Sequence, residues 1–182
     1  MHDRTTERVI TESLHCKIQE AIDRTAHLVS LVPAPESGFH PRAAASPEIR
    51  FTDLAHLLGH LLDCTSGICA ALRAAFPSKL AHFDKLRCDQ VNHGCEPAEA
   101  LLRIAAYSTH ISHGFSICTD SDLARKIPTV FVPQGETLAT LLLGNLEHLL
   151  NHKAQLFFYL KLLGVHVGTA DLYALRADPP KA

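Results

Sequence analysis

The sequence predicts an all-α fold, and three observations lead to that class. Four segments place apolar residues at helical spacing over about twenty or more positions each. The chain has no repeated strand pattern, and it shows no strict internal repeat. Four amphipathic helices of this length bury their apolar faces most simply against one another, so the expected architecture is a four-helix bundle.

The first two predicted helices are separated by a long connection. Residues 7–31 form the first helix, and two prolines just beyond it end the pattern. Its apolar stripe contains Ile10, Leu14, Ile18, Ile22 and Val29. Residues 33–50 are rich in Pro, Ala and Ser without periodicity, which predicts a connection over the surface. The second helix is expected to start at Asp53, a typical N-cap residue, and to run to Pro77.

The third and fourth helices follow a mixed segment and a second connection. Residues 78–95 show no clear pattern, and residues 96–118 predict the third helix, with a proline in its first turn. Residues 129–132, TVFV, lie between two prolines and indicate a short extended piece or edge strand. The fourth helix is expected to begin at position 135 or 136 and to end at 163, where Gly164 stops it.

The composition is that of an ordinary globular protein, 47% hydrophobic and 20% charged. We expect a single domain over residues 1–182 with a flexible tail from about 174. A formal net charge of −2 provides no basic field for nucleic acid or for anionic lipid, so neither partner is expected. No uninterrupted apolar run reaches the ~20 residues of a membrane span, and no signal peptide is readable. Six cysteines without a C-x-x-C pair do not favour a disulfide framework, so a cytoplasmic protein is expected.

A row of polar residues interrupts the apolar fourth helix. Asn145, His148, His152 and Gln155 follow one another at steps of three and four residues, which places them on one face. The same face continues at its two ends through Leu138, Leu141, Tyr159 and Leu162. In a bundle such a face is expected to point inward, where an unsatisfied imidazole or amide costs ~1–3 kcal/mol. The row therefore needs partners.

A metal ion would supply partners for the two histidines of this row. Imidazoles at positions i and i+4 lie one turn apart and can reach one Zn²⁺ or similar cation. Asn145, Gln155 and Tyr159 border the pair and are expected to orient the rings through hydrogen bonds. With 13 histidines in 182 residues, about one such pair arises by chance. A hydrogen-bonded polar cluster in the core is therefore the alternative interpretation.

A third ligand is expected from the second helix, which carries His56 and His60. His60 lies on the apolar seam, whereas His56 lies closer to the side of two aspartates, so His60 is the better candidate and His56 the alternative. Three histidines without a fourth protein ligand leave one position for water or substrate, which is typical of catalytic sites. The chain has neither an H-E-x-x-H motif nor paired E-x-x-H motifs, so metallopeptidase and di-iron chemistry are not expected.

Three motifs make the chain resemble the DinB-like superfamily, which includes the YfiT-like metal-dependent hydrolases. These motifs are HLLGHLLD in the second helix, HLLNHKAQ in the fourth and the closing YLKLLGVHV. The resemblance extends loosely over residues 10–173, and His56 departs from it by replacing a usually acidic residue. It implies a four-helix bundle with a long crossover between helices two and three, often dimeric. It also implies three ligands, His60, His148 and His152, for one nickel, zinc or similar divalent ion.

The resemblance implies chemistry on a small molecule without fixing the reaction. Some relatives are similar to transferases that use low-molecular-weight thiols such as bacillithiol or mycothiol. Besides nickel and zinc, three imidazoles also suit iron. Any of these metals lowers the pKa of a bound thiol or water. We therefore expect a transferase or hydrolase that activates a thiol or water for attack on a small electrophilic substrate. The alternative is a non-catalytic metal-binding or stress-response protein.

The leucines of the fourth helix predict self-association. Leu143, Leu146 and Leu150 lie on faces of the helix other than the polar row. Together they are more apolar residues than one neighbouring helix of the bundle is expected to cover. An apolar excess of this kind indicates a second contact surface, so a homodimer is expected.

Overall fold

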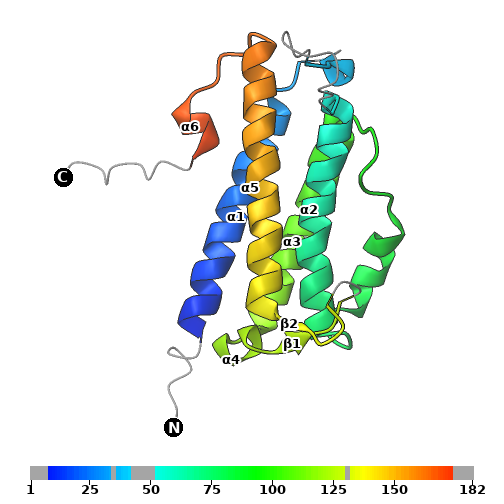
Figure 1. Ribbon diagram of the computed structural model, residues 1–182, viewed down its shortest axis with the longest axis vertical. Coiled ribbons are helices and arrows are strands. Elements are labelled where there is room, and N and C mark those ends of the chain that lie inside the picture. Colours follow the sequence, from blue (N-terminus) through cyan, green and yellow to red (C-terminus); the bar gives the residue numbers. More distant parts are fainter. Residues whose placement is uncertain (1–7, 34–35, 42–51, 130–131, 174–182) are drawn as a thin grey trace, which may run out of the picture.

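The computed structural model describes residues 8–33, 36–41, 52–129 and 132–173. Four long helices form a bundle (Figure 1), and they are α1 (Val9–Ser30), α2 (Leu54–Ala75), α3 (Pro97–Ile117) and α5 (Leu138–Leu162). In Figure 1, α1 and α5 run upward while α2 and α3 run downward. The all-α four-helix bundle predicted from the sequence is confirmed.

Short elements occupy the connections between the long helices. They are the 3₁₀ helices η2 (Glu36–Gly38) and η3 (Ala81–Cys88), the single-turn helices α4 (Asp120–Leu123) and α6 (Thr169–Leu172), and the strands β1 (Lys126–Ile127) and β2 (Glu136–Thr137). The two strands form an antiparallel pair of two residues each. The expected flexible tail at residues 174–182 and most of the expected surface connection at 33–50 lie outside the described residues.

The long crossover joins α2 to α3, as the resemblance implied. Because these two helices run in the same direction, the chain must return along the bundle between them (Figure 1). The returning segment docks on the first turns of α2, where the backbone N–H of Asn92 donates to Gly59 O at 3.1 Å. The N–H of Cys95 likewise donates to Ala55 O at 3.1 Å. These two bonds fix the position of the crossover along the axis of α2.

The helix boundaries follow the predicted signals closely. Asp53 caps α2, because its side-chain oxygen accepts a hydrogen bond from the backbone N–H of His56 at 2.7 Å. Helix α5 begins two or three residues later than expected, since residues 136–137 pair with β1 and Thr137 becomes the N-cap. Gly164 follows α5 with a φ of 79°, a conformation that glycine adopts without strain.

The short extended piece or edge strand expected at residues 129–132 is described only at its two ends, Thr129 and Val132, and neither belongs to a strand. The backbone N–H of Thr129 donates to Val132 O at 3.2 Å. The strand pairing lies on either side of these residues, in β1 and β2. Residues 130 and 131 lie outside the described part of the chain.

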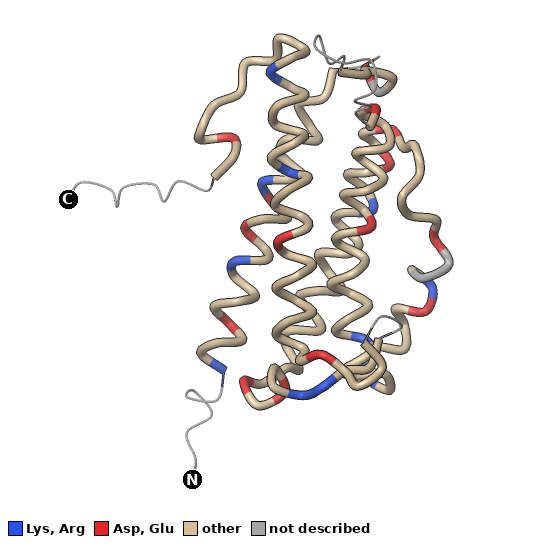
Figure 2. Tube along the Cα trace, viewed as in Figure 1, with Lys and Arg blue, Asp and Glu red and all other residues tan. Residues whose placement is uncertain are grey.

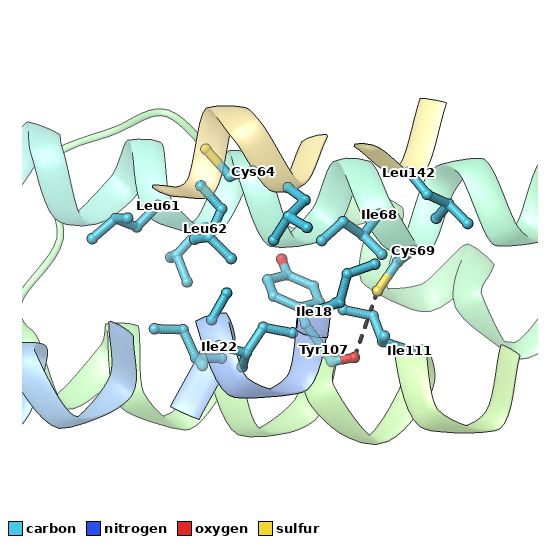
Figure 3. Close-up of a cluster of buried hydrophobic side chains, with 14 of the residues drawn as sticks. Ile18, Ile22, Leu61, Leu62, Cys64, Ile68, Cys69, Tyr107, Ile111 and Leu142 are labelled. Carbon is cyan, nitrogen blue, oxygen red and sulfur yellow. Dashed lines mark hydrogen bonds between the residues drawn. The ribbon is translucent and has the colours of Figure 1, made fainter. Parts of the chain in front are cut away.

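The core lies between the four long helices and is almost entirely apolar (Figure 3). Each long helix contributes side chains with 1% exposure or less, including Ile18, Ile22, Leu61, Leu62, Ile68, Tyr107, Ile111 and Leu142. Cys69 is buried here and donates to Tyr107 O at 3.6 Å. Burial raises the pKa of the neighbouring Cys64 to about 12, so that thiol is an unreactive core residue.

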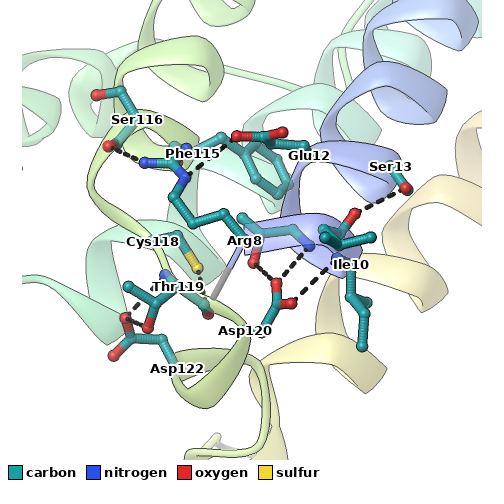
Figure 4. A network of polar contacts seen from close by, with 12 residues as sticks. Arg8, Ile10, Glu12, Ser13, Phe115, Ser116, Cys118, Thr119, Asp120 and Asp122 are labelled. Carbon is teal, nitrogen blue, oxygen red and sulfur yellow. Dashed lines mark hydrogen bonds and ion pairs between the residues drawn. The ribbon is translucent and has the colours of Figure 1, made fainter. Parts of the chain in front are cut away.

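A polar network ties the start of α1 to the end of α3 (Figure 4). The Asp120 carboxylate accepts hydrogen bonds from the backbone N–H and the hydroxyl of Thr11, at 2.8 and 2.7 Å. The Arg8 guanidinium donates to the carbonyl oxygens of Phe115 and Ser116, at 3.0 and 2.7 Å. The first N–H groups of a helix have no partner within it, so Asp120 supplies the missing acceptor.

The polar row of α5 does not point into the centre of the bundle. The buried face of α5 is formed instead by Leu138, Leu142, Leu146, Leu149, Leu156 and Leu160. The row from Asn145 to Gln155 is half-buried at the edge of this face, and Leu162, expected at its end, is 65% exposed. Leu142, Leu146, Leu149 and Leu156 each follow a residue of the predicted face by one position, and on a helix of 3.6 residues per turn one position is a rotation of about 100°.

Two of the three leucines expected in a second contact are covered, although α5 also exposes Phe158 and Leu162, at 62% and 65%. Leu146 is buried within the bundle and Leu150 is half-buried, whereas Leu143 is 53% exposed. The leucine argument for a homodimer is therefore reduced to Leu143, and the homodimer stays a prediction.

Charge and hydropathy are distributed as in a globular bundle. Basic and acidic residues alternate along the described chain without separating into one-sign regions (Figure 2). By length and composition, α2 is the one described helix apolar enough to cross a membrane, and 61% of its apolar window is buried inside the bundle. That burial is what the core helix of a bundle shows.

Candidate metal centre

Three histidine side chains from two helices converge at the α2–α5 contact. His60 comes from α2, and His148 and His152 come from α5. One nitrogen of each ring lies within 4.8 Å of one nitrogen of each other ring. The ring centroids are 4.5 Å apart for His60 and His152, 4.7 Å for His148 and His152, and 5.2 Å for His60 and His148. Among the described residues, this is the one group of His, Cys, Asp or Glu that closes in this way.

Antiparallel pairing of α2 and α5 brings the three rings together. His148 and His152 are one turn apart on α5, so their rings project from the same face. His60 lies on the facing side of α2 at the same height. All three side chains are half-buried, which leaves the rings sheltered by the helices yet within reach of solvent.

A directed hydrogen-bond chain sets the tautomer of His152. The Tyr159 hydroxyl donates to the carbonyl oxygen of Thr52 at 2.7 Å, so it accepts the hydrogen bond from Gln155 Nε2 at 3.0 Å. The Gln155 amide oxygen is thereby turned toward His152 Nδ1, at 3.2 Å. An amide oxygen can only accept, so Nδ1 of His152 carries the proton. Its Nε2 is left with a free lone pair, the form in which imidazole binds metal.

The crossover supplies the corresponding partner for His60. Asn92 Oδ1 lies 2.7 Å from His60 Nδ1, so this nitrogen also donates and the Nε2 of His60 also keeps its lone pair. Asn92 adopts a φ of 57°, a left-handed conformation that asparagine tolerates better than most residues. Gly59 makes the close approach possible, because a Cβ there would lie 2.8 Å from the carbonyl carbon of His93 and nearer still to its oxygen.

Sequence reasoning missed Asn92 as a residue of this site. The signal that could have indicated it is the Asn-His-Gly turn in the crossover, because such a turn favours asparagine with positive φ. The contact itself joins residues 32 positions apart, and it exists only because the crossover returns to the start of α2.

The donor set fits a divalent metal ion. Tetrahedral zinc with bonds of ~2.0–2.1 Å requires nitrogens ~3.3 Å apart, so rings already within 4.8 Å need only small side-chain rotations. Two of the three rings have their outer nitrogen hydrogen-bonded to a side-chain amide, which is the usual support for ligating histidines. His60, His148 and His152 together can therefore hold one metal ion.

The surroundings of His152 favour its neutral imidazole form. Burial lowers the pKa of His152, and the neighbouring rings of His60 and His148 lower it further. Asp63, one turn beyond His60 on α2, and the hydrogen bond to Gln155 act in the opposite direction. The net lowering of the pKa keeps the His152 lone pair available near neutral pH.

Two residues expected near the metal lie elsewhere. His56, the alternative ligand, has a side chain 54% exposed, and its Nδ1 lies 3.6 Å from an Asp53 carboxylate oxygen, outside the histidine group. Asn145, expected to orient a ring, instead donates from Nδ2 to Leu141 O at 2.8 Å. Its other end faces Gly67 on α2, because a Cβ at position 67 would lie 3.0 Å from Asn145 Cγ. Asn145 thus bridges the two helices.

A solved structure with the same fold is the crystal structure of a DinB-like protein, YjoA, from Bacillus subtilis. The two chains superpose with a TM-score of 0.60 at 17% sequence identity, over 86% of this chain and 94% of that one. The likeness shows a DinB-like four-helix-bundle fold, as the motifs indicated. No family model matches the sequence, and no curated protein is found to be similar to it.

Proposed function

We propose that the protein is a mononuclear metal-dependent enzyme that activates a thiol or water for attack on a small electrophilic substrate. The observation that carries this proposal is the convergence of three imidazoles, two of which have Nδ1 already engaged by an amide oxygen. His60, His148 and His152 would hold the ion through their inner nitrogens. A divalent ion in that position supplies Lewis acidity, which lowers the pKa of the thiol or water that it binds.

The surrounding residues support binding and orientation. Asn92 and Gln155 hold the rings of His60 and His152 in the ligating tautomer, and the buried Tyr159 fixes Gln155. The half-buried rings leave room for an exogenous ligand, which is the requirement of a catalytic metal site as opposed to a closed structural one. Zinc, nickel and iron all suit three imidazoles.

The first test is the metal content of the purified untagged protein, measured by plasma mass spectrometry. We expect near one equivalent of a divalent metal in the wild type, lost in the double variant His148→Ala, His152→Ala while circular dichroism stays helical. His56→Ala is the matched control, because it removes a neighbouring histidine of α2 outside the group, and it should keep the metal. A wild type that stays metal-free after reconstitution with zinc, nickel or iron would overturn the proposal.

A second measurement distinguishes the enzyme from a non-catalytic metal-binding or stress-response protein. Cobalt(II) is substituted into the site and the visible spectrum is followed while a low-molecular-weight thiol is added. A new thiolate-to-cobalt band would support thiol transfer, whereas a pH-dependent spectrum without thiol binding would support activation of water. A spectrum insensitive to both would indicate a closed site and favour the non-catalytic role.

Two further parts of the proposal concern the setting of the enzyme. We propose a cytoplasmic protein, because six cysteines without a C-x-x-C pair suit a reducing compartment and the apolar helix α2 is mostly buried inside the bundle. A homodimer is proposed with the exposed Leu143 in the contact, and light scattering that gives a monomer mass would contradict it. We expect no nucleic acid or membrane partner.

A further inference from the structure

A cavity of about 480 Å³ lies in the groove between α2 and α5, about one to two helical turns from the three histidines, none of which lines it. The walls on the two helices are Gly67, Ala70, Ala71, Ala74, Leu141 and Asn145. The end of the cavity farther from the histidines is lined by residues of β1, β2 and the described positions between them, which are Ile127, Pro128, Thr129, Val132 and Glu136. Ala70 and Ala74 are exposed, so the cavity is open to solvent along one side. Its volume falls in the range of ~300–1,000 Å³ that is typical of small-molecule sites.

The cavity and the histidine group share the same faces of the same two helices. Gly67 follows His60 by two turns on α2, and Asn145 precedes His148 by one turn on α5. At ~1.5 Å of rise per residue, the cavity begins roughly 5–10 Å from the histidines along the helix axes. Asn145 forms the border between the two, since it lines the cavity and lies on the polar row with His148.

Small side chains create this space where two long helices would otherwise be in close contact. Three alanines and one glycine of α2 face the α5 wall, and Gly67 allows the Asn145 side chain to lie across the groove. The one charged side chain among the lining residues is Glu136 in β2, at the end farther from the histidines. A lining of this kind favours an uncharged apolar group and provides no positive charge for an anion.

We propose that the substrate of the metal-dependent reaction carries an uncharged alkyl or aryl group that occupies this cavity while its electrophilic head lies at the three histidines. This inference rests on the proposed function. The cavity is about three times the volume of an engineered cavity of ~150 Å³ that binds benzene, so it accommodates more than a single ring. Binding of the apolar group in the cavity would hold the electrophilic head of the substrate in position at the metal.

The experiment uses aliphatic hydroxamates, in which a metal-binding head carries an unbranched tail of chosen length. Affinities of aceto-, octano- and dodecanohydroxamate are measured by calorimetry on the zinc-loaded full chain. Each methylene that enters the cavity should tighten binding by about fourfold, so the long members should bind at least tenfold more tightly than acetohydroxamate. Acetohydroxamate reports on the metal alone.

The variant Ala74→Phe fills the cavity from its open side, 14 residues along α2 from His60. It should abolish the tail-length advantage and leave zinc content and acetohydroxamate affinity unchanged. Ala105→Phe is the matched control, because Ala105 is exposed on α3 and does not line the cavity. Ala70→Leu, a smaller filling of the same wall, serves if Ala74→Phe fails to fold.

The outcomes separate this inference from the proposed function. If acetohydroxamate binds but affinity is flat with tail length, or both phenylalanine variants lose the advantage equally, the cavity is not the substrate site. If the protein holds no metal, the proposed function fails and the metal-based inference with it. Displacement of the neutral dye Nile red by 1-octanol, compared between wild type and Ala74→Phe, then shows whether the cavity still binds apolar molecules.

Discussion

Replacing Gly59 by alanine tests how the crossover builds the site. Gly59 lies inside α2, where alanine is favoured over glycine by ~1 kcal/mol on helix propensity alone. The structure predicts the opposite result, because a Cβ at position 59 would lie 2.8 Å from the backbone nitrogen and carbonyl carbon of His93. These are backbone atoms, so no side-chain rotation relieves the overlap.

The expected magnitude follows from the bonds that the crossover must give up. Moving it away from α2 breaks the hydrogen bonds from Asn92 N to Gly59 O and from Cys95 N to Ala55 O, each worth ~0.5–1.5 kcal/mol. Overpacking adds a cost of ~1–3 kcal/mol. After the gain in helix propensity, Gly59→Ala should destabilise the protein by roughly 1–5 kcal/mol. Asn92 would also leave His60, so zinc affinity should fall.

Gly144→Ala is the matched control, since Gly144 also lies inside a long helix but a Cβ there meets nothing within 4 Å. This variant should be stabilised by ~0.5–1 kcal/mol. Both free energies of unfolding are measured by urea titration of the metal-free protein, and zinc affinity by competition with a chelator. A Gly59→Ala variant as stable as Gly144→Ala would refute the close docking of the crossover.

Three other predictions concern the site and the stability of the bundle. Asn92→Ala removes the acceptor of His60 Nδ1 and should weaken zinc binding roughly 10- to 100-fold without unfolding the protein; unchanged affinity in the chelator competition would separate Asn92 from the site. Tyr159→Phe frees Gln155 and should lower the urea unfolding free energy by ~1 kcal/mol, and a variant as stable as the wild type would argue against the hydrogen-bond chain. Burial, and then two neighbouring histidines, lower the pKa of His110 from 6.5, so its contribution to stability is present above pH 6.5 and is lost as the pH falls. The urea midpoint of His110→Phe should therefore drop less than that of the wild type between about pH 7.5 and 5.5, and an equal drop would contradict this assignment.

Local patterns were sufficient for the helices and for two of the three histidines of the candidate metal centre. The N-cap at Asp53 and the stop at Gly164 act within a few residues of the chain, so the sequence predicts them directly. The pairing of His148 with His152 follows from helix geometry alone, because positions i and i+4 share a face wherever the helix is placed. The fold class likewise follows from apolar periodicity.

Other features depend on how distant segments meet. His60 joins the group, and His56 does not, because the packing of α2 against α5 turns the face of α2 that carries His60 toward His148 and His152. The sequence of a single helix does not contain its rotation relative to a neighbouring helix. Asn92 reaches His60 only through the crossover, and the cavity exists only where small residues of α2 face Asn145. By itself, the sequence determined the helices and the pair of histidines on α5, and it favoured His60 over His56 as the third member of the group. The tertiary structure confirmed that His60 joins the pair, and it alone decided the amide partner of His60 and the adjoining cavity, because these depend on packing between distant segments.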